Sequence, residues 1–126
     1  MRPPMVGMPA PRFVHSCTIR NNSNGNIKVQ ILYRGPAPEG QGFQQEASTV
    51  DIPVGGYIRA KERSTNHGSY QTRKEIAAIK VLRANGQKQK IVAPFEGVNG
   101  VELNWVFIVD NYQIQSVNPH PTTNIF

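Results

Sequence analysis

Apolar and polar residues alternate along several segments of this chain. From Ile27 to Arg34 every second residue is apolar, and the same period of two returns from Val101 to Val109. This period places apolar side chains on one face of a β-strand and polar side chains on the other, which is typical of a half-buried strand in an antiparallel sheet. We predict strands at residues 14–20, 27–34, 44–52, 57–62, 101–109 and 112–117.

Segments rich in Asn, Gly and Pro separate these strands. Residues 21–26, Asn-Asn-Ser-Asn-Gly-Asn, tolerate left-handed backbone conformations and predict a turn that joins 14–20 to 27–34 as a hairpin. Pro53–Gly56 ends another predicted strand, and Asp110–Asn111 is expected to form a two-residue turn into the last strand.

Residues 72–84 fit two structures. Their first residues match a helix capping box, and apolar residues three apart follow. Asn85-Gly86 is, however, the strongest two-residue hairpin signal, with apolar residues alternating on both sides of it. Because every neighbouring prediction is a strand, we favour the hairpin. A two-residue loop would pair Ile79 with Val92 and Lys80 with Ile91.

The spacing of these segments predicts the fold class. About eight short strands, roughly 8–12 residues apart, are typical of a single antiparallel β-sandwich, Ig-like or related, and a small β-barrel is the second choice. The chain has 126 residues and a mass of 14.0 kDa, which suits one domain. We place this domain at residues 13–117. The Pro- and Met-rich residues 1–12 are expected to form a disordered arm, and residues 118–126 a flexible tail.

Composition argues against several classes of protein. The longest apolar run, Trp105–Val109, is far shorter than the roughly 20 residues of a membrane-spanning helix. The single cysteine, Cys17, cannot form an intramolecular disulfide, and no short Cys/His spacing indicates a zinc site. Residues 1–11 contain no apolar stretch like that of a signal peptide, so we expect an intracellular, cytoplasmic location rather than secretion.

No set of residues along the chain indicates catalysis. His15, His67 and His120 fall in a predicted strand, a loop and the tail, without a second ligand or a carboxylate at short spacing. Cys17 falls on the apolar face of its predicted strand, where a thiol is inert. The glycines of residues 35–42 lack the Lys and Ser/Thr of a phosphate-binding loop. We therefore expect a non-enzymatic protein with no cofactor and no metal.

Positive charge is concentrated in one third of the sequence. The chain has 14 Lys and Arg against 8 Asp and Glu, which gives a formal net charge of +6 and a pI near 9.8. Residues 57–90 hold nine of the basic residues and two of the acidic ones, a net charge of +7. The candidate polyanion-binding residues in this window are Tyr57, Arg59, Lys61, Arg63, Tyr70, Arg73, Lys74, Arg83, Lys88 and Lys90.

Two functions fit this pattern. The first is a non-enzymatic interaction module that engages another macromolecule through loops or a basic face. The alternative is a binder of polyanions, either single-stranded nucleic acid or an anionic membrane surface. In that case residues 57–61 and residues 88–90 would lie on neighbouring strands and form one basic strip. Otherwise, the window is a solvated face that keeps the domain soluble.

Overall fold

The computed structural model describes residues 12–36, 43–66 and 68–119. These residues contain twelve strands and no helix, so the predicted all-β class is confirmed and residues 72–84 adopt the hairpin alternative. The strands are β1 (Phe13–Val14), β2 (Cys17–Asn21), β3 (Ile27–Pro36), β4 (Phe43–Ile52), β5 (Tyr57–Ala60), β6 (Ser64–Asn66), β7 (Gln71–Arg73), β8 (Glu75–Arg83), β9 (Lys88–Val92), β10 (Val101–Glu102), β11 (Trp105–Val109) and β12 (Ile114–Val117).

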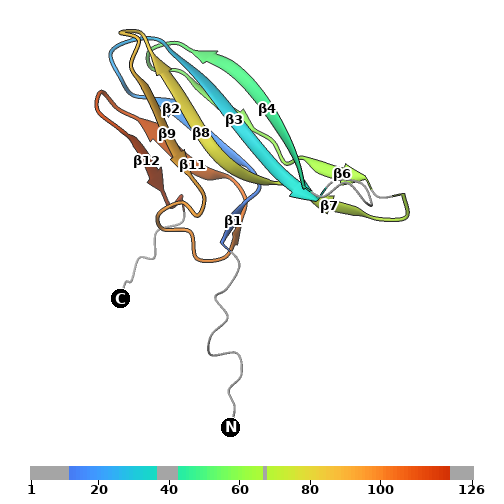
Figure 1. Cartoon of the computed structure of the whole chain (residues 1–126). Helices are drawn as coiled ribbons and strands as arrows, with labels where there is room; N and C mark the ends of the chain where they lie inside the picture. The colour runs from blue at the N-terminus through green and yellow to red at the C-terminus, as the bar shows by residue number, and fades with distance from the viewer. Residues whose placement is uncertain (1–11, 37–42, 67, 120–126) are drawn as a thin grey trace, which may run out of the picture.

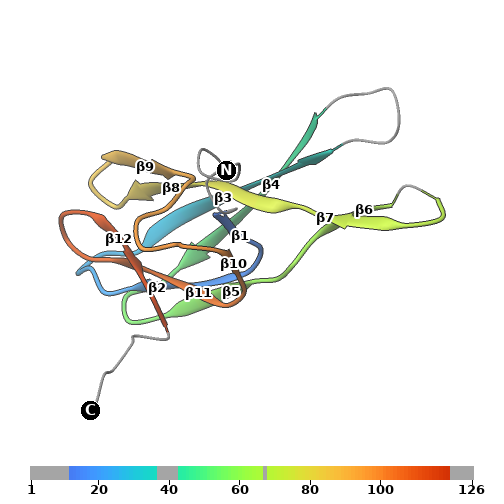
Figure 2. The same cartoon turned by 90° about the horizontal axis from the view of Figure 1, so that it is seen from below.

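Eight of these strands form two four-stranded sheets that pack face to face (Figures 1 and 2). The first, called the β3 sheet below, has the order β4-β3-β8-β9, and the second, the β11 sheet, has the order β12-β11-β2-β5. Neighbouring strands in both sheets are antiparallel except β2 and β11, which are parallel. Two layers of this kind form the predicted β-sandwich, and the described strands do not close into the barrel that was the second choice.

The apolar positions of the alternating pattern form the interior between the sheets. Phe95 packs edge-to-face against Phe107, with ring centroids 4.8 Å apart. Trp105 is also buried, and its indole Nε1–H donates to Ser116 Oγ at 2.8 Å. Each fully buried side chain of this size stabilises the fold by about 1.5–3 kcal/mol. The largest buried side chains are Trp105, Tyr33, Phe107, Ile19, Ile52, Ile76 and Ile79.

The predicted hairpin between residues 14–20 and 27–34 is wrong. The strand before the turn, β2, pairs with β5 and β11 in the β11 sheet. The strand after the turn, β3, belongs to the β3 sheet. The Asn-rich segment therefore crosses between the layers. The buried Asn21 side chain holds this corner: its Nδ2 donates to Gly25 O at 2.9 Å and to Ile52 O at 3.0 Å, and its Oδ1 accepts from Ser23.

The predicted strand 101–109 is interrupted, and the turn after it is longer than expected. Asn104 adopts φ 60°, a left-handed conformation that ends β10 before β11 begins, and its N–H donates to Ser16 Oγ. The loop between β11 and β12 is Asp110–Gln113, because Val109 pairs with Ile114. Asp110 Oδ1 accepts two backbone N–H groups within this loop, which satisfies a four-residue turn rather than the predicted two-residue one.

The β8–β9 hairpin forms as predicted, but its register is one residue away from the prediction. Arg83 N donates to Gln87 O at 2.8 Å, which leaves a three-residue loop of Ala84, Asn85 and Gly86. Gly86 has φ 91°, the left-handed residue that such a loop requires. The pairs are therefore Ile79 with Ile91 and Lys80 with Lys90, not Ile79 with Val92 and Lys80 with Ile91.

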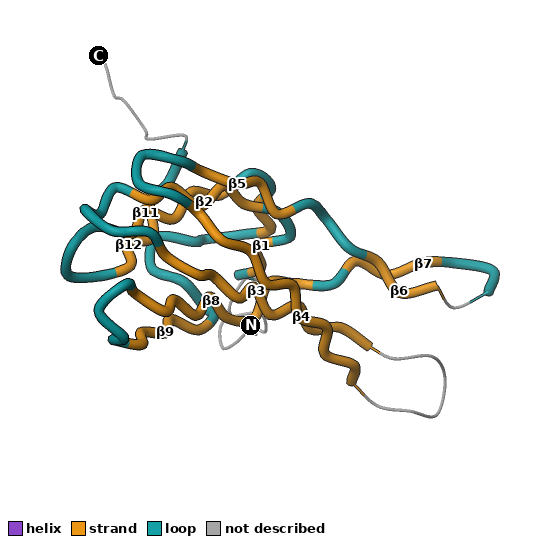
Figure 3. Tube along the Cα trace, turned by 90° about the horizontal axis from the view of Figure 1, so that it is seen from above, coloured by secondary structure: helices purple, strands orange, loops and turns teal. Residues whose placement is uncertain are grey.

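Two ribbons extend beyond one end of the sandwich (Figures 2 and 3). One is the outer part of the β3–β4 hairpin, and the other is the β6–β7 pair. Most of the predicted arm (1–12) and most of the predicted tail (118–126) lie outside the described residues. Within the part of the chain that is described, no helix has the length and apolar character needed to span a membrane.

Candidate polyanion-binding face

The outer face of the β3 sheet carries four lysines in two adjacent cross-strand rows. Lys80 of β8 lies directly opposite Lys90 of β9. In the next row, Leu82 lies between Lys28 of β3 and Lys88 of β9. Side chains two residues apart on a strand point to the same face, and so do side chains paired directly across neighbouring strands. These residues therefore all project from the same side of the sheet. Lys28, Lys80, Lys88 and Lys90 are called the lysine face below.

An open depression of about 600 Å³ lies among these lysines. All four lysines line it and are exposed to solvent. Leu82, which is 38% exposed, lies between two of them and supplies apolar surface. The depression therefore offers several ammonium groups around a partly apolar floor.

Most of this positive charge has no counter-charge. Among the described residues of these two rows the single carboxylate is Asp51, which lies 3.6 Å from Lys28 Nζ. Both side chains are exposed, and a pair of this kind contributes about 0–1 kcal/mol. Lys80, Lys88 and Lys90 form no ion pair with any described residue. Two like charges directly opposite each other destabilise a sheet, so the pair of Lys80 and Lys90 costs stability.

Of the ten candidate residues in the basic window, only Lys88 and Lys90 lie on the lysine face. Tyr57 and Arg59 are exposed on β5, the edge strand of the β11 sheet, and Lys61 follows that strand. The strand that carries Lys88 and Lys90 is an edge of the β3 sheet, on the side where it meets β12. These two basic strands are not neighbours, so the continuous basic strip expected from the sequence is not formed.

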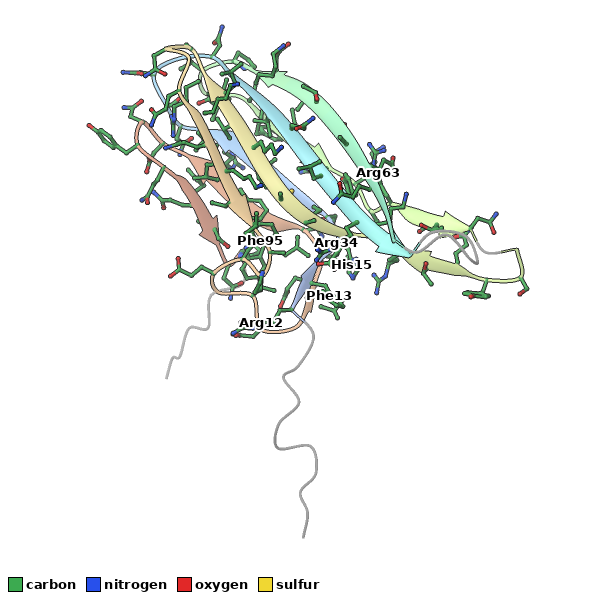
Figure 4. All side chains as sticks on the ribbon, viewed as in Figure 1. Arg12, Phe13, His15, Arg34, Arg63 and Phe95 are labelled. Atoms are coloured by element: carbon green, nitrogen blue, oxygen red, sulfur yellow. The ribbon has the colours of Figure 1, made fainter. Side chains whose placement is uncertain are left out.

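Arg63 and Lys74 belong instead to an ion cluster around Glu46. Lys74 is 5% exposed, and its Nζ donates to Glu46 Oε1 at 2.7 Å, while Arg63 Nη1 donates to Glu46 Oε2. The Arg63 guanidinium also lies over the Tyr33 ring, 4.9 Å from its centroid. Figure 4 shows Arg63 at the end of the sandwich from which the β6–β7 ribbon extends. Hydrogen bonds from Lys74 and then Arg63 lower the pKa of Glu46, so the carboxylate stays ionised and offsets one of the two positive charges beside it.

The remaining candidates have structural contacts of their own. Arg83 is buried and donates to Asp110 O at 2.6 Å, which ties the β3 sheet to the β11–β12 loop. Arg73 pairs with Glu62 at 3.2 Å. Tyr70 is exposed, next to the start of β7. None of these three lies on the lysine face.

Two residues of the lysine face were missed in the sequence. Lys28 lies outside the window of residues 57–90, although the alternation of residues 27–34 placed it on the polar side of its strand. Lys80 lies inside the window, but the predicted register set it opposite Ile91. Only the pairing of β3 with β8 and of β8 with β9 brings these lysines together.

Among the described residues, the other chemistry-bearing side chains do not converge on this face. Cys17 is buried, and burial raises the pKa of its thiol to about 12, so it is held as an inert apolar group. His15 Nδ1 donates to the Lys74 carbonyl at 2.7 Å. Across the described ranges, no group of three or more His, Cys, Asp and Glu side chains is arranged to hold a metal ion.

The fold and the site together define a β-sandwich protein with a cationic sheet face. A scan against protein-family models found no matching family, and a search of curated proteins found no match.

Proposed function

We propose that this chain is a non-enzymatic binding module whose lysine face binds the phosphate groups of an anionic membrane surface. The observation that carries the proposal is the row in which Lys80 faces Lys90, beside a row that holds Lys28 and Lys88. A fold that places uncompensated like charges side by side gives up stability. An anionic partner restores it, because the partner's phosphates neutralise the ammonium groups.

A membrane fits this face better than single-stranded nucleic acid. Proteins that bind single strands stack the bases on aromatic side chains, and the described rows of the lysine face contain none. A lipid surface requires no stacking. Leu82 and Val92, both exposed on this face, are suited to contact the boundary between headgroups and acyl chains.

The expected affinity is modest and depends on salt. A lysine near an anionic membrane surface contributes about 1 kcal/mol, so four lysines contribute about 4 kcal/mol. This corresponds to a dissociation constant of roughly 1 mM for the face alone. Screening acts over about 8 Å at physiological ionic strength and about 30 Å at 0.01 M, so binding is strongest at low salt.

Cosedimentation with vesicles tests the proposal. Vesicles of phosphatidylcholine alone are compared with vesicles that also contain phosphatidylserine or a multiply phosphorylated phosphatidylinositol, at low and at physiological salt. The variant Lys80→Glu/Lys90→Glu reverses one row of the face. It loses about 2 kcal/mol of attraction before repulsion is counted, so binding is expected to fall at least about 30-fold.

The matched control is Arg59→Glu/Lys61→Glu, which changes the net charge by the same amount on exposed residues at a distant edge. It is expected to keep binding within about 3-fold of the unmodified chain. Equal losses in both variants would mean that net charge alone drives binding, and the lysine face would not be the site. Tighter, lysine-dependent binding of a fluorescent single-stranded oligonucleotide would assign the face to nucleic acid instead.

A further inference from the structure

The sandwich is bridged along one side and open along the other. On the side of β9 and β12, Gln89 Nε2 donates to Tyr112 O at 2.7 Å, and Arg83 donates to Asp110 O. On the side of β4 and β5, the described residues of the two strands form no such bridge, and a groove of about 450 Å³ lies there. Its apolar lining comes from both sheets: Ile31, Tyr33, Val50, Ile58 and Ala60.

The groove is bounded at both ends. At one end the chain itself joins β4 to β5 through the turn Pro53–Gly56, in which Gly56 N donates to Pro53 O at 2.9 Å. At the other end the Tyr33 hydroxyl donates to Lys61 O at 2.8 Å, and Arg63 covers the Tyr33 ring. The four residues of β5 between these ends span roughly 13 Å, which suits a short extended segment.

The outer edge of β5 is a template for such a segment. Among the described strands, β5 pairs only with β2, so the backbone groups on its other edge have no strand partner. Along β5 the less exposed Ile58 and Ala60 alternate with the exposed Tyr57 and Arg59, and Arg59 and Lys61 line the groove together with the apolar residues. An added strand would place alternate side chains in the groove and the others beside the exposed cation.

The charge on this edge selects the partner. Arg59 and Lys61 are exposed and form no ion pair with any described residue, and Arg20 lies nearby over the Tyr57 ring, 5.1 Å from its centroid. A second copy of β5 would bring the same positive charges to the edge. Residues 1–11 and 120–126 contain no Asp or Glu, so the side chains of these two segments do not supply the complementary charge.

We infer that the open edge of β5 binds an extended acidic peptide, in which Asp or Glu alternates with apolar residues, as an added strand. The apolar side chains fill the groove against Val50 and Ile58. The carboxylates lie beside Arg59 and Lys61. This surface is separate from the lysine face, and its partner differs from the one proposed for that face.

Fluorescence anisotropy with a labelled synthetic peptide of alternating Asp and Val, about seven residues long, tests this inference. Binding is expected to fall at least about tenfold in the Arg59→Glu/Lys61→Glu variant. The control Lys80→Glu/Lys90→Glu, with the same change in net charge, is expected to stay within about 2-fold of the unmodified chain. A peptide of alternating Lys and Val tests the sign of the charge, and one of alternating Asp and Ser tests the groove; both are expected to bind at least about tenfold more weakly.

Strand pairing is tested on the peptide, which leaves the protein intact. N-methylation of every second amide removes donors from one edge of the peptide strand only. Two series of peptides are compared, one methylated at the odd-numbered residues and one at the even-numbered residues. One series is expected to lose binding and the other to keep it. Equal binding by both series, no binding of the Asp/Val peptide up to about 1 mM, or equal loss in both charge variants would overturn the inference. If Arg59→Glu/Lys61→Glu self-associates and the unmodified chain binds no peptide, the two cations serve only to prevent edge-to-edge pairing of β5 with another copy.

Discussion

Lys90→Glu is expected to stabilise the fold while it weakens binding at the lysine face. Lys80 and Lys90 lie directly opposite each other on exposed neighbouring strands. Two unit charges about 6 Å apart in water repel by roughly 0.7 kcal/mol. Reversing one of them turns the repulsion into an attraction of similar size, an upper limit of about 1.4 kcal/mol before screening. Salt and side-chain freedom reduce this to about 0.5–1 kcal/mol, the usual range for a cross-strand pair.

Thermal unfolding followed by circular dichroism measures this gain. A domain of about 100 residues shifts its melting temperature by about 4–5 °C per kcal/mol, so Lys90→Glu is expected to melt about 2–5 °C higher. Lys61→Glu is the control because it makes the same change in net charge on an exposed residue away from the face. It removes the general self-repulsion of the +6 chain equally, so the difference between the variants isolates the pair.

The salt dependence makes the test sharper. In about 1 M salt the screening length is roughly 3 Å, and the advantage of Lys90→Glu is expected to disappear. A melting temperature at or below that of the unmodified chain would refute the reasoning. So would a gain no larger than that of Lys61→Glu, or a gain that persists in high salt. Higher stability together with weaker vesicle binding would show that Lys90 favours membrane binding and lowers the stability of the fold.

Three further predictions concern the interior. Glu46→Gln leaves the buried ammonium of Lys74 without its carboxylate and is expected to lower the free energy of unfolding by about 2–3 kcal/mol at neutral pH. Because a hydrogen bond from Lys74 lowers the pKa of Glu46, this contribution is fully present above the ordinary glutamate pKa of 4.5 and is lost as the pH falls through the lower folded-state pKa, so the difference in urea unfolding should shrink on acidification. Gly35→Ala places a Cβ 2.9 Å from the Lys74 side chain and should cost about 1–3 kcal/mol in urea unfolding, whereas Gly100→Ala, whose Cβ would have no atom within 4 Å outside its own and the two adjacent residues, should be nearly neutral. Cys17, whose thiol pKa burial raises to about 12, should react with a thiol reagent only after unfolding, and labelling of the folded protein would contradict its placement.

Local pattern predicted the strands well and their partners less well. Alternation identified the buried side of β3 and β11 because burial on one face of a strand depends on residues two apart. The hairpin expected across residues 21–26 failed because the turn residues specify a bend but not which strand continues the sheet. In the folded chain, this crossover is held by contacts distant in sequence, such as the hydrogen bond from the Asn21 side chain to Ile52 O, 31 residues away.

The lysine face could not be read from the window of basic residues for the same reason. Charge density along the chain identified Lys88 and Lys90, but it also selected Lys74 and Arg83, which the fold buries. A long cationic side chain in the sequence is equally compatible with a solvated surface and with a buried ion cluster. The neighbouring strand decides between them, and Glu46 became the partner of Lys74 only through the pairing of β3 with β4 and β8.

The register of the β8–β9 hairpin explains why the lysines meet, but not why they are lysines. A two-residue loop would have turned Lys90 toward the interior, and burying an unpaired ammonium costs far more than the left-handed glycine that the three-residue loop uses. Packing of the partly buried Ile91 beside the buried Ile79 therefore fixes positions 80 and 90 opposite each other on the outer face. Exposed positions of this kind accept Thr, Gln or Glu with equal or better stability. The fold alone does not require lysine at positions 80 and 90, or Lys28 and Lys88 in the next row. Binding of an anionic partner would explain why all four positions are lysine.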